Sequence, residues 1–197
     1  MMRLVIILAG ATLFLAGPVA ADGPFGVTMG SNPLDYPTCK AAEGVTGAYD
    51  CSGLPRSHPD MRVYNLISSS ETGVCLLRGS TDILETSSFG SELRMKTEEL
   101  KDQVSSVYGP SNKFDFIMPR SIWIDPSYWM MAIVKNDRHY AYAWNKDSKA
   151  RLKDNIKNIV LSAKAIDATR GYVQIEYVFE NHAKCQEEHK KARAKAF

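Results

Sequence analysis

The sequence lacks the residue patterns that mark the best-known classes of catalytic site. It contains no Gly-x-Ser-x-Gly nucleophile elbow, no His-Glu-x-x-His zinc motif, no phosphate-binding glycine loop, no Cys-x-x-Cys pair and no EF-hand loop. Triads and carboxylate pairs can still be assembled from residues that lie far apart in the chain. The absence makes an enzyme less expected without excluding one, and no cofactor is predicted.

The chain also lacks a strong charge imbalance. Its 24 lysines and arginines oppose 22 aspartates and glutamates, so the overall charge gives no attraction to nucleic acid. Long apolar segments are missing as well, because the longest candidate after the N-terminal region is YWMMAIV at 128–134, which has the length of a strand. We therefore expect no nucleic-acid partner and no integral membrane span beyond the N-terminal region.

Residues 1–21 have the three-part layout of a cleavable signal peptide. Arg3 supplies the positive charge, and the apolar run at 4–16 has the length of a signal sequence rather than of a membrane span. A Gly-Pro pair ends the run, and the Val-Ala-Ala that follows supplies the small residues that signal peptidase requires. We predict cleavage before Asp22 and a periplasmic or secreted protein. A buried N-terminal helix is the alternative.

Four cysteines lie in the part of the chain that would remain after cleavage. An even number of cysteines in an oxidising compartment favours disulfides over free thiols. Three pairings are possible. The favoured one joins Cys39 to Cys51, which share a turn-rich stretch, and Cys75 to Cys185, which would tie the C-terminal segment to an early strand. The alternative is that one pair stays reduced and buried, because sequence alone cannot fix the connectivity.

The first half of the exported part is predicted to contain one clear helix. Thr97 can cap it, and Leu100, Val104, Val107 and Tyr108 then occupy positions i, i+4, i+7 and i+8 of one helical face. A Gly-Pro pair ends this helix. The other elements expected here are a strand at 25–30, a helix start capped by Asn32, a turn-rich loop at 44–59, and antiparallel strands at 61–67, 74–77 and 81–86.

The second half is predicted to consist mainly of strands, at 121–124, 128–134, 139–144, 158–165 and 172–179, followed by a C-terminal helix or tail at 181–197. In the last strand Val173, Ile175, Tyr177 and Phe179 alternate with polar residues, which indicates a sheet with one buried face and one wet face. The pattern predicts an α+β fold, with a mainly antiparallel sheet and a few packing helices. Residues 22–197 would form a single compact domain stabilised by disulfides.

Four short motifs lie within or at the ends of these predicted elements. They are Phe25-Gly26 leading to Gly30, Tyr108-Gly109-Pro110 at the end of a helix, and the strand motifs Ile159-Val160-Leu161 and Tyr177-Val178-Phe179. In these motifs the chain resembles small exported bacterial α+β domains of uncharacterised function, over most of its exported part. The resemblance implies a fold and a compartment, and it implies no catalytic residue.

Aromatic residues are concentrated around the strand expected at 139–144. Tyr140, Tyr142 and Trp144 alternate with small residues, so their rings share one face of the strand. Together with Trp129 they could line a ligand groove or a protein-binding patch, and these four are the predicted binding residues. Packing in the core beneath the helices is the alternative, because an antiparallel sheet needs one apolar face.

Two histidines lie two positions from an aspartate in predicted turns. His139 follows Asp137, and His58 precedes Asp60, so either pair could supply a general base with its orienting acid. A solvated contact that stabilises the turn is the alternative, and no catalytic residue is assigned.

A third group of residues has the spacing of a metal site on a helix. His182, Cys185 and His189 would share one side of the C-terminal helix and could bind zinc or copper. This requires Cys185 to be a free thiol, whereas a disulfide is the favoured state, so no metal site is assigned.

These observations favour an exported, non-enzymatic binding protein whose partner is a protein or another envelope component. The protein could be an inhibitor or an immunity protein. The alternative is an envelope hydrolase that uses a histidine and a carboxylate. A metal-binding protein is a third, less favoured possibility.

Overall fold

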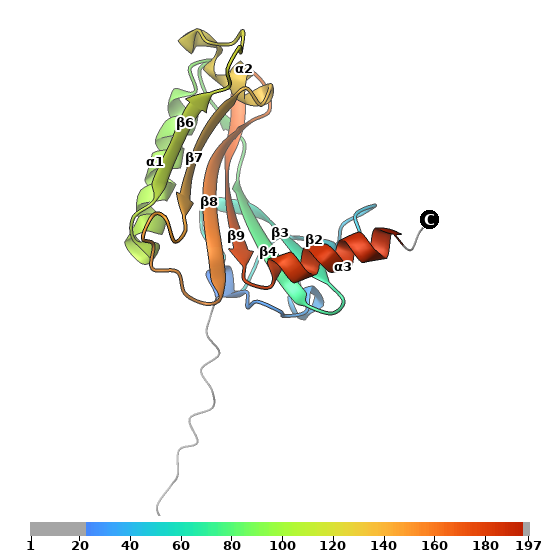
Figure 1. Cartoon of the computed structure of the whole chain (residues 1–197). Helices are drawn as coiled ribbons and strands as arrows, with labels where there is room; N and C mark the ends of the chain where they lie inside the picture. Colours follow the sequence, from blue (N-terminus) through green and yellow to red (C-terminus); the bar gives the residue numbers. More distant parts are fainter. Residues whose placement is uncertain (1–22, 195–197) are drawn as a thin grey trace, which may run out of the picture.

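The computed structural model describes residues 23–194, so the predicted signal peptide and its cleavage site lie outside the described residues. A nine-stranded sheet dominates the described part (Figure 1). Its strands follow the order β1-β2-β3-β4-β9-β8-β7-β6, β5 pairs with β9, and every pair is antiparallel. The strands are β1 (Cys39–Ala41), β2 (Ala48–Cys51), β3 (Met61–Ser69), β4 (Gly73–Thr81), β5 (Leu84–Glu85), β6 (Asn112–Ile117), β7 (Arg138–Trp144), β8 (Ile156–Ala165) and β9 (Arg170–Phe179).

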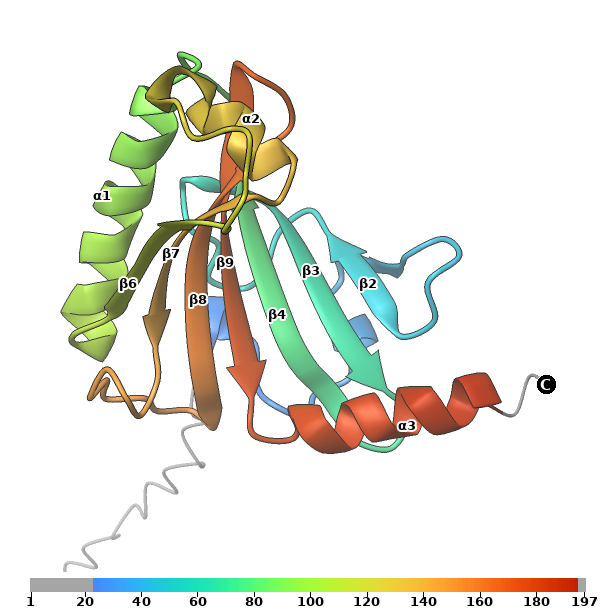
Figure 2. The same cartoon turned by 45° about the horizontal axis from the view of Figure 1, so that its top comes forward.

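Three α-helices pack on this sheet. They are α1 (Ser91–Tyr108), α2 (Trp129–Val134) and α3 (His182–Ala194). Helix α1 contacts β5, β8 and β9, α2 contacts β7 and β8, and α3 contacts β3 and β4. Figures 1 and 2 show α2 and α3 at opposite ends of the sheet. Single 3-10 turns are formed by η1 (Pro24–Gly26), η2 (Pro33–Asp35) and η3 (Pro126–Tyr128).

The core lies between α1, α2 and one face of the sheet. On β9 the alternation predicted from the sequence is confirmed, because Val173, Ile175, Tyr177 and Phe179 are buried and the residues between them are half-buried. The register places Ile175 beside Leu161 of β8, and Leu161 beside Tyr142 of β7. The apolar residues of successive strands therefore form one continuous face.

The opposite face carries the polar partners of this alternation. Glu176 of β9 lies opposite Arg78 of β4, and its carboxylate oxygen Oε2 is 2.6 Å from the Arg78 Nε atom. Helix α3 lies over one end of the sheet, where it contacts β3 and β4 and is bonded to β4 through Cys75–Cys185. The sheet thus has one face under helices and one that is largely open to solvent.

The predicted fold is confirmed in its main features. The described residues form a single compact domain with a mainly antiparallel sheet, a few helices and two disulfides. The description α+β fits only roughly, because the sheet dominates the helices. In the described part of the chain, no helix is both long enough and apolar enough to cross a bilayer.

Both favoured cysteine pairings are present. Cys39 and Cys51 lie directly opposite each other on β1 and β2 and form one disulfide. Cys75 of β4 and Cys185 of α3 form the other, across a sequence separation of 110 residues. Disulfides are typical of proteins in an oxidising, extracytoplasmic environment.

Helix α1 begins earlier than predicted. Its first residue is Ser91, and Gly90 with φ 69° precedes it, whereas the predicted cap Thr97 is buried inside the helix and donates a 2.7 Å hydrogen bond to the Leu93 carbonyl. The Glu92 carboxylate accepts hydrogen bonds from the Thr86 hydroxyl and the Ser87 amide, which ties the helix start to the preceding turn. The predicted end at Tyr108 is confirmed.

The predicted strand at 128–134 is wrong, because most of this segment is helix α2. Asp125 accepts a 2.8 Å hydrogen bond from the Ser127 amide, and Pro126 occupies the first turn, so the Asp-Pro pair starts helical structure instead of separating strands. The apolar run is buried on most sides, and such a run has no periodicity that distinguishes helix from strand.

Other boundaries also differ from the prediction. The segment expected as a strand at 25–30 begins with η1, where Phe25 has φ 54°, and contributes no strand to the sheet. Asn32 caps only the single turn η2. The loop at 44–59 includes β2, the strand at 81–86 is reduced to the two residues of β5, and no strand forms at 121–124. Strand β6 was not predicted.

Candidate functional site

The four predicted binding residues lie in the core. Tyr140, Tyr142, Trp144 and Trp129 are only 3%, 5%, 0% and 5% exposed. All four belong to the hydrophobic core, and Trp129 of α2 packs edge-on against Tyr140 with ring centroids 5.5 Å apart, so the four rings do not form an exposed surface in this structure. The stripe identified from the sequence is therefore the apolar face that the sheet buries, which was the stated alternative.

A carboxylate from α1 joins two of these rings to the helix. Glu98 Oε1 accepts hydrogen bonds from the hydroxyls of Tyr140 and Tyr142, and Lys113 Nζ of β6 lies 3.2 Å from the same oxygen. Burial acts to raise the pKa of Glu98, but these hydrogen bonds and the Lys113 charge outweigh it and lower the pKa. Burial and the Glu98 carboxylate raise the pKa of Tyr142. The arrangement connects α1 with β6 and β7.

His58 is held by two hydrogen bonds. Its Nδ1 accepts a 3.2 Å hydrogen bond from the Asp60 amide, and its Nε2 lies 2.8 Å from Oε1 of Gln103 on α1. A ring protonated at Nε2 satisfies both contacts. The Asp60 carboxylate is 4.0 Å from Nδ1 and only 2.9 Å from Lys96 Nζ, so it pairs with the lysine. His58 therefore lacks the orienting acid that a general base requires.

The second candidate histidine is exposed on β7, the strand next to the edge strand β6. The exposed ring of His139 stacks on Phe116 with ring centroids 5.0 Å apart. The Asp137 carboxylate instead accepts a 2.8 Å hydrogen bond from Ser121, and no ion pair joins Asp137 to His139 within residues 23–194. The structure does not assemble a histidine–carboxylate pair at this position.

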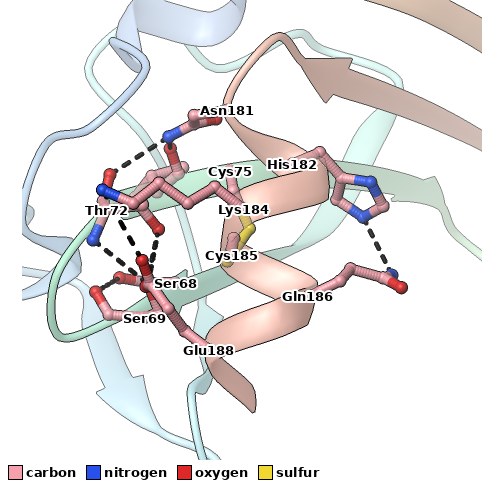
Figure 3. The surroundings of a disulfide bond; sticks show 11 residues. Ser68, Ser69, Thr72, Cys75, Asn181, His182, Lys184, Cys185, Gln186 and Glu188 are labelled. Carbon is pink, nitrogen blue, oxygen red and sulfur yellow. Dashed lines mark hydrogen bonds and ion pairs between the residues drawn. A yellow bond between two sulfur atoms is a disulfide. The ribbon is translucent and has the colours of Figure 1, made fainter. Parts of the chain in front are cut away.

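The condition for the proposed metal site is not met. Cys185 is bonded to Cys75, and Figure 3 shows His182 directed toward Gln186 at the side of α3. No group of three potential metal ligands occurs among the described residues. The hypothesis of a metal site on α3 is therefore not carried further.

A half-open cavity of about 220 Å³ lies beneath the C-terminal half of α1. The apolar face that the sequence predicts for this helix forms its roof, with Val107 half exposed at 49%. The main lining residues are Leu100, Val104, Val107 and Tyr108 from α1 and Ile175 and Tyr177 from β9. His58 and Gln103 also line it, so the bond that fixes His58 lies beside the cavity.

Tyr108 and Tyr177 are among the residues that bring polar groups to this largely apolar lining, together with His58 and Gln103. Burial raises the pKa of Tyr108 to about 12, with a smaller contribution from Asp154, and burial also raises the pKa of Tyr177. Both hydroxyls therefore stay protonated near neutral pH and can donate hydrogen bonds. Neither makes a hydrogen bond to another residue of the described range 23–194. Their ring centroids are 6.2 Å apart, so one bound group could contact both.

Two larger clefts, of about 520 and 550 Å³, flank helix α3. Ser69 and Thr72 both donate hydrogen bonds to Glu188 (Figure 3), whereas the buried His189 Nε2 atom makes no hydrogen bond within residues 23–194. The linings consist mainly of turn residues and of residues on α3. The smaller cavity beneath α1 is the better candidate, because specific ligand sites are mostly apolar with a few convergent polar groups.

Four residues of this cavity belong to the short sequence motifs described above, which by themselves indicate only turns and strands. Phe25, Tyr108, Leu161 and Tyr177 come one from each of the four motifs described above, and all four residues line the cavity. The Phe25 ring also packs edge-on against Tyr177, with centroids 5.7 Å apart. Spacing along the chain could not show that these motifs meet, because they lie on four separate elements.

Compared with known proteins, the chain matches no protein-family model, no curated protein and no solved structure.

Proposed function

We propose that this is an exported, non-enzymatic binding protein that holds the acyl chain of a small amphiphile in the cavity beneath α1. The observation that carries the proposal is the half-open apolar cavity of about 220 Å³, lined by two tyrosines whose hydroxyls make no hydrogen bond to another residue within 23–194. The aliphatic lining suits the chain. The Tyr108 and Tyr177 hydroxyls suit the carbonyl or carboxyl oxygen at its end, because both are donors.

Packing energetics support an occupant for this space. Water gains little from a lining with so few polar groups. An acyl chain gains about 0.8 kcal/mol for each methylene that it buries, so filling the cavity is favourable.

The other features agree with export and with binding. Residues 1–21 have the layout of a signal peptide, and both disulfides suit the periplasm or the medium. The burial of the aromatic stripe removes the main support for an inhibitor or immunity protein that docks through that strand. Within residues 23–194 the Asp60 carboxylate lies closer to Lys96 than to His58, and the Asp137 carboxylate accepts a hydrogen bond from Ser121, so the hydrolase alternative has less support than binding.

Titration calorimetry with sodium decanoate tests the proposal. Val104→Trp fills the cavity from its roof, and Met95→Trp, at a position on α1 that is 68% exposed, is the matched control. We expect wild type and Met95→Trp to bind alike and Val104→Trp to bind at least about tenfold more weakly, a loss of about 1.4 kcal/mol. Both variants must first show wild-type circular dichroism.

Absence of decanoate binding to wild type, or equal binding to all three proteins, would overturn the proposal. Hydrolysis of 4-nitrophenyl decanoate provides a separate check on the non-enzymatic part. Turnover that is lost in His58→Gln would show that this histidine acts catalytically. Slow hydrolysis at the same rate in wild type and His58→Gln would show that His58 does not catalyse it.

A further inference from the structure

We infer that a second copy of this chain pairs with strand β6, in an antiparallel arrangement with Phe114 opposite Phe114 of the partner. Strand β6 (Asn112–Ile117) is the edge of the sheet that lies next to β7. Apart from its ladder with β7, residues 112–117 make no backbone hydrogen bond to any residue in the described range. The outer row of amide and carbonyl groups is therefore available to another strand.

The two edges of the sheet differ in their capacity for such pairing. Strand β1, at the other edge, has only three residues, and one of them is the disulfide-bonded Cys39. Strand β6 has six residues, of which five are exposed, and the main contacts of α1 are with β5, β8 and β9. Figure 1 shows β6 at the margin of the sheet, beside β7. A long exposed edge is the usual template for strand addition.

The face of β6 that points away from α1 carries exposed aromatic residues. Phe114 and Phe116 are 42% and 46% exposed, and the ring of His139 stacks on Phe116. Lys113 and Asp115 occupy the other face, because they pair with Tyr142 and Tyr140 of the α1-facing stripe. Antiparallel pairing about Phe114 would bring the phenylalanines of both copies together on one face, where cross-strand aromatic contacts are stabilising.

The charges of Lys113 and Asp115 favour one register of the paired β6 strands and favour a second copy of the chain as the partner. With Phe114 at the twofold axis, Lys113 of each chain lies opposite Asp115 of the other, so the pairing forms two opposite-charge pairs. A twofold axis at Asp115 or at Lys113 would place like charges directly opposite, which is destabilising. Within each chain Lys113 already contacts Glu98, and Asp115 lies 2.6 Å from Arg138. The paired strands would thus carry alternating acids and bases on the α1 side.

Sedimentation velocity over a range of concentrations tests the association, using protein purified from cells that express the full chain. Asp115→Lys converts both cross-strand charge pairs into like-charge pairs, so the dissociation constant of the dimer should rise roughly tenfold. Met95→Lys introduces the same charge on the exposed side of α1 and should leave association unchanged. A wild-type protein that stays monomeric at every concentration would overturn the inference, as would equal effects of the two variants.

Disulfide trapping tests the register independently. All four native cysteines are already paired, so Phe114→Cys introduces a single reactive thiol. Residues directly opposite across antiparallel strands have Cα atoms about 4.5 to 5.5 Å apart, within disulfide range. Phe116→Cys is the matched control, because its two copies would lie four residues apart, or about 13 Å. Oxidised glutathione should yield covalent dimers of the first variant only, and dimers of Phe116→Cys alone would exclude this register.

Discussion

Helices α1 and α3 are attached to the same sheet in different ways. Helix α1 has 18 residues and buries Leu93, Thr97, Leu100 and Tyr108 against the apolar face. Helix α3 has 13 residues and buries only Cys185. Apolar burial stabilises in proportion to the area removed from water, and α3 contributes little of it. One helix is therefore part of the core, whereas the other is an attachment that needs additional bonds.

Those additional bonds are covalent and polar. The Cys75–Cys185 disulfide anchors α3 to β4. The Asn181 side chain donates hydrogen bonds of 3.1 and 3.0 Å to the carbonyls of Thr72 and Val74, and Glu188 accepts hydrogen bonds from Ser69 and Thr72 (Figure 3). All of these bonds reach the end of β3, the turn that follows it or the start of β4. Helix α3 therefore depends on one disulfide and on bonds around one turn, while α1 depends on packing along its length.

Removal of the Cys75–Cys185 bond should lower the free energy of unfolding more than any other change considered and should release α3 from the sheet. Cys75→Ala with Cys185→Ala opens the loop of 110 residues, which lowers the free energy of unfolding by about 4 to 5 kcal/mol on the chain-entropy account. Hydrogen exchange should show lost protection in α3 and retained protection in α1. Urea unfolding of wild type and the double variant measures the loss in the free energy of unfolding.

The matched control for this prediction is Cys39→Ala with Cys51→Ala. Its loop spans 12 residues, for which the same account gives about 3 kcal/mol, and it should leave the exchange of α3 unchanged. If α3 stayed protected after loss of its own disulfide, the polar bonds would be sufficient and the proposed dependence on the disulfide would be wrong.

The buried face of α1 should account for most of the stability that this helix contributes. Leu93 is fully buried in the first half of this helix, so Leu93→Ala should lower the free energy of unfolding by about 3 kcal/mol through lost burial and the cavity that remains. Met95→Ala, two residues further on the exposed side, should change it by less than about 0.5 kcal/mol. Chemical denaturation measures both. Similar losses in the two variants would mean that α1 is not stabilised by its buried face.

The two helices also show how far the sequence predicts this structure. Strands β7, β8 and β9 follow from alternation, because their buried face repeats every second residue. The first turns of α1 did not follow, since Leu93 is their one buried residue and the helix starts at Gly90 without a side-chain cap. Local pattern cannot reveal that Thr97 is buried by tertiary packing. Strand β6 was missed because both of its faces are largely exposed, so no buried face marks its periodicity.

The candidate cavity was less predictable than the fold. Spacing alone identifies Leu100, Val104, Val107 and Tyr108 as one face of a helix. It does not show that this face leaves space above Tyr177 instead of packing fully against it. The same limit applies to the aromatic stripe on β7, because alternation gives the shared face and only the position of α1 decides whether that face is open. Burial is a tertiary property that periodicity leaves undetermined.

The smallest expected effect concerns the polar contact that α1 does make. Glu98 joins α1 to Tyr140 and Tyr142, and Glu98→Gln should lower the free energy of unfolding by about 1 kcal/mol, because the site is partly exposed and solvent weakens the interaction. The folded-state pKa of Glu98 lies below its ordinary value of 4.5. Its contribution is therefore complete above that value and lost as the pH falls through the folded-state pKa.

Wild type should accordingly lose more stability than Glu98→Gln as the pH falls from 6 through about 4.5 and below, as measured by urea unfolding at each pH. Glu187→Gln on α3 is the control, since that carboxylate is paired only with Lys191 on the surface of the same helix. Its replacement should leave the free energy of unfolding at each pH close to that of wild type, because the pair lies on the surface. Parallel pH profiles for wild type and Glu98→Gln would mean that this partly exposed carboxylate does not contribute to the attachment of α1 to the sheet.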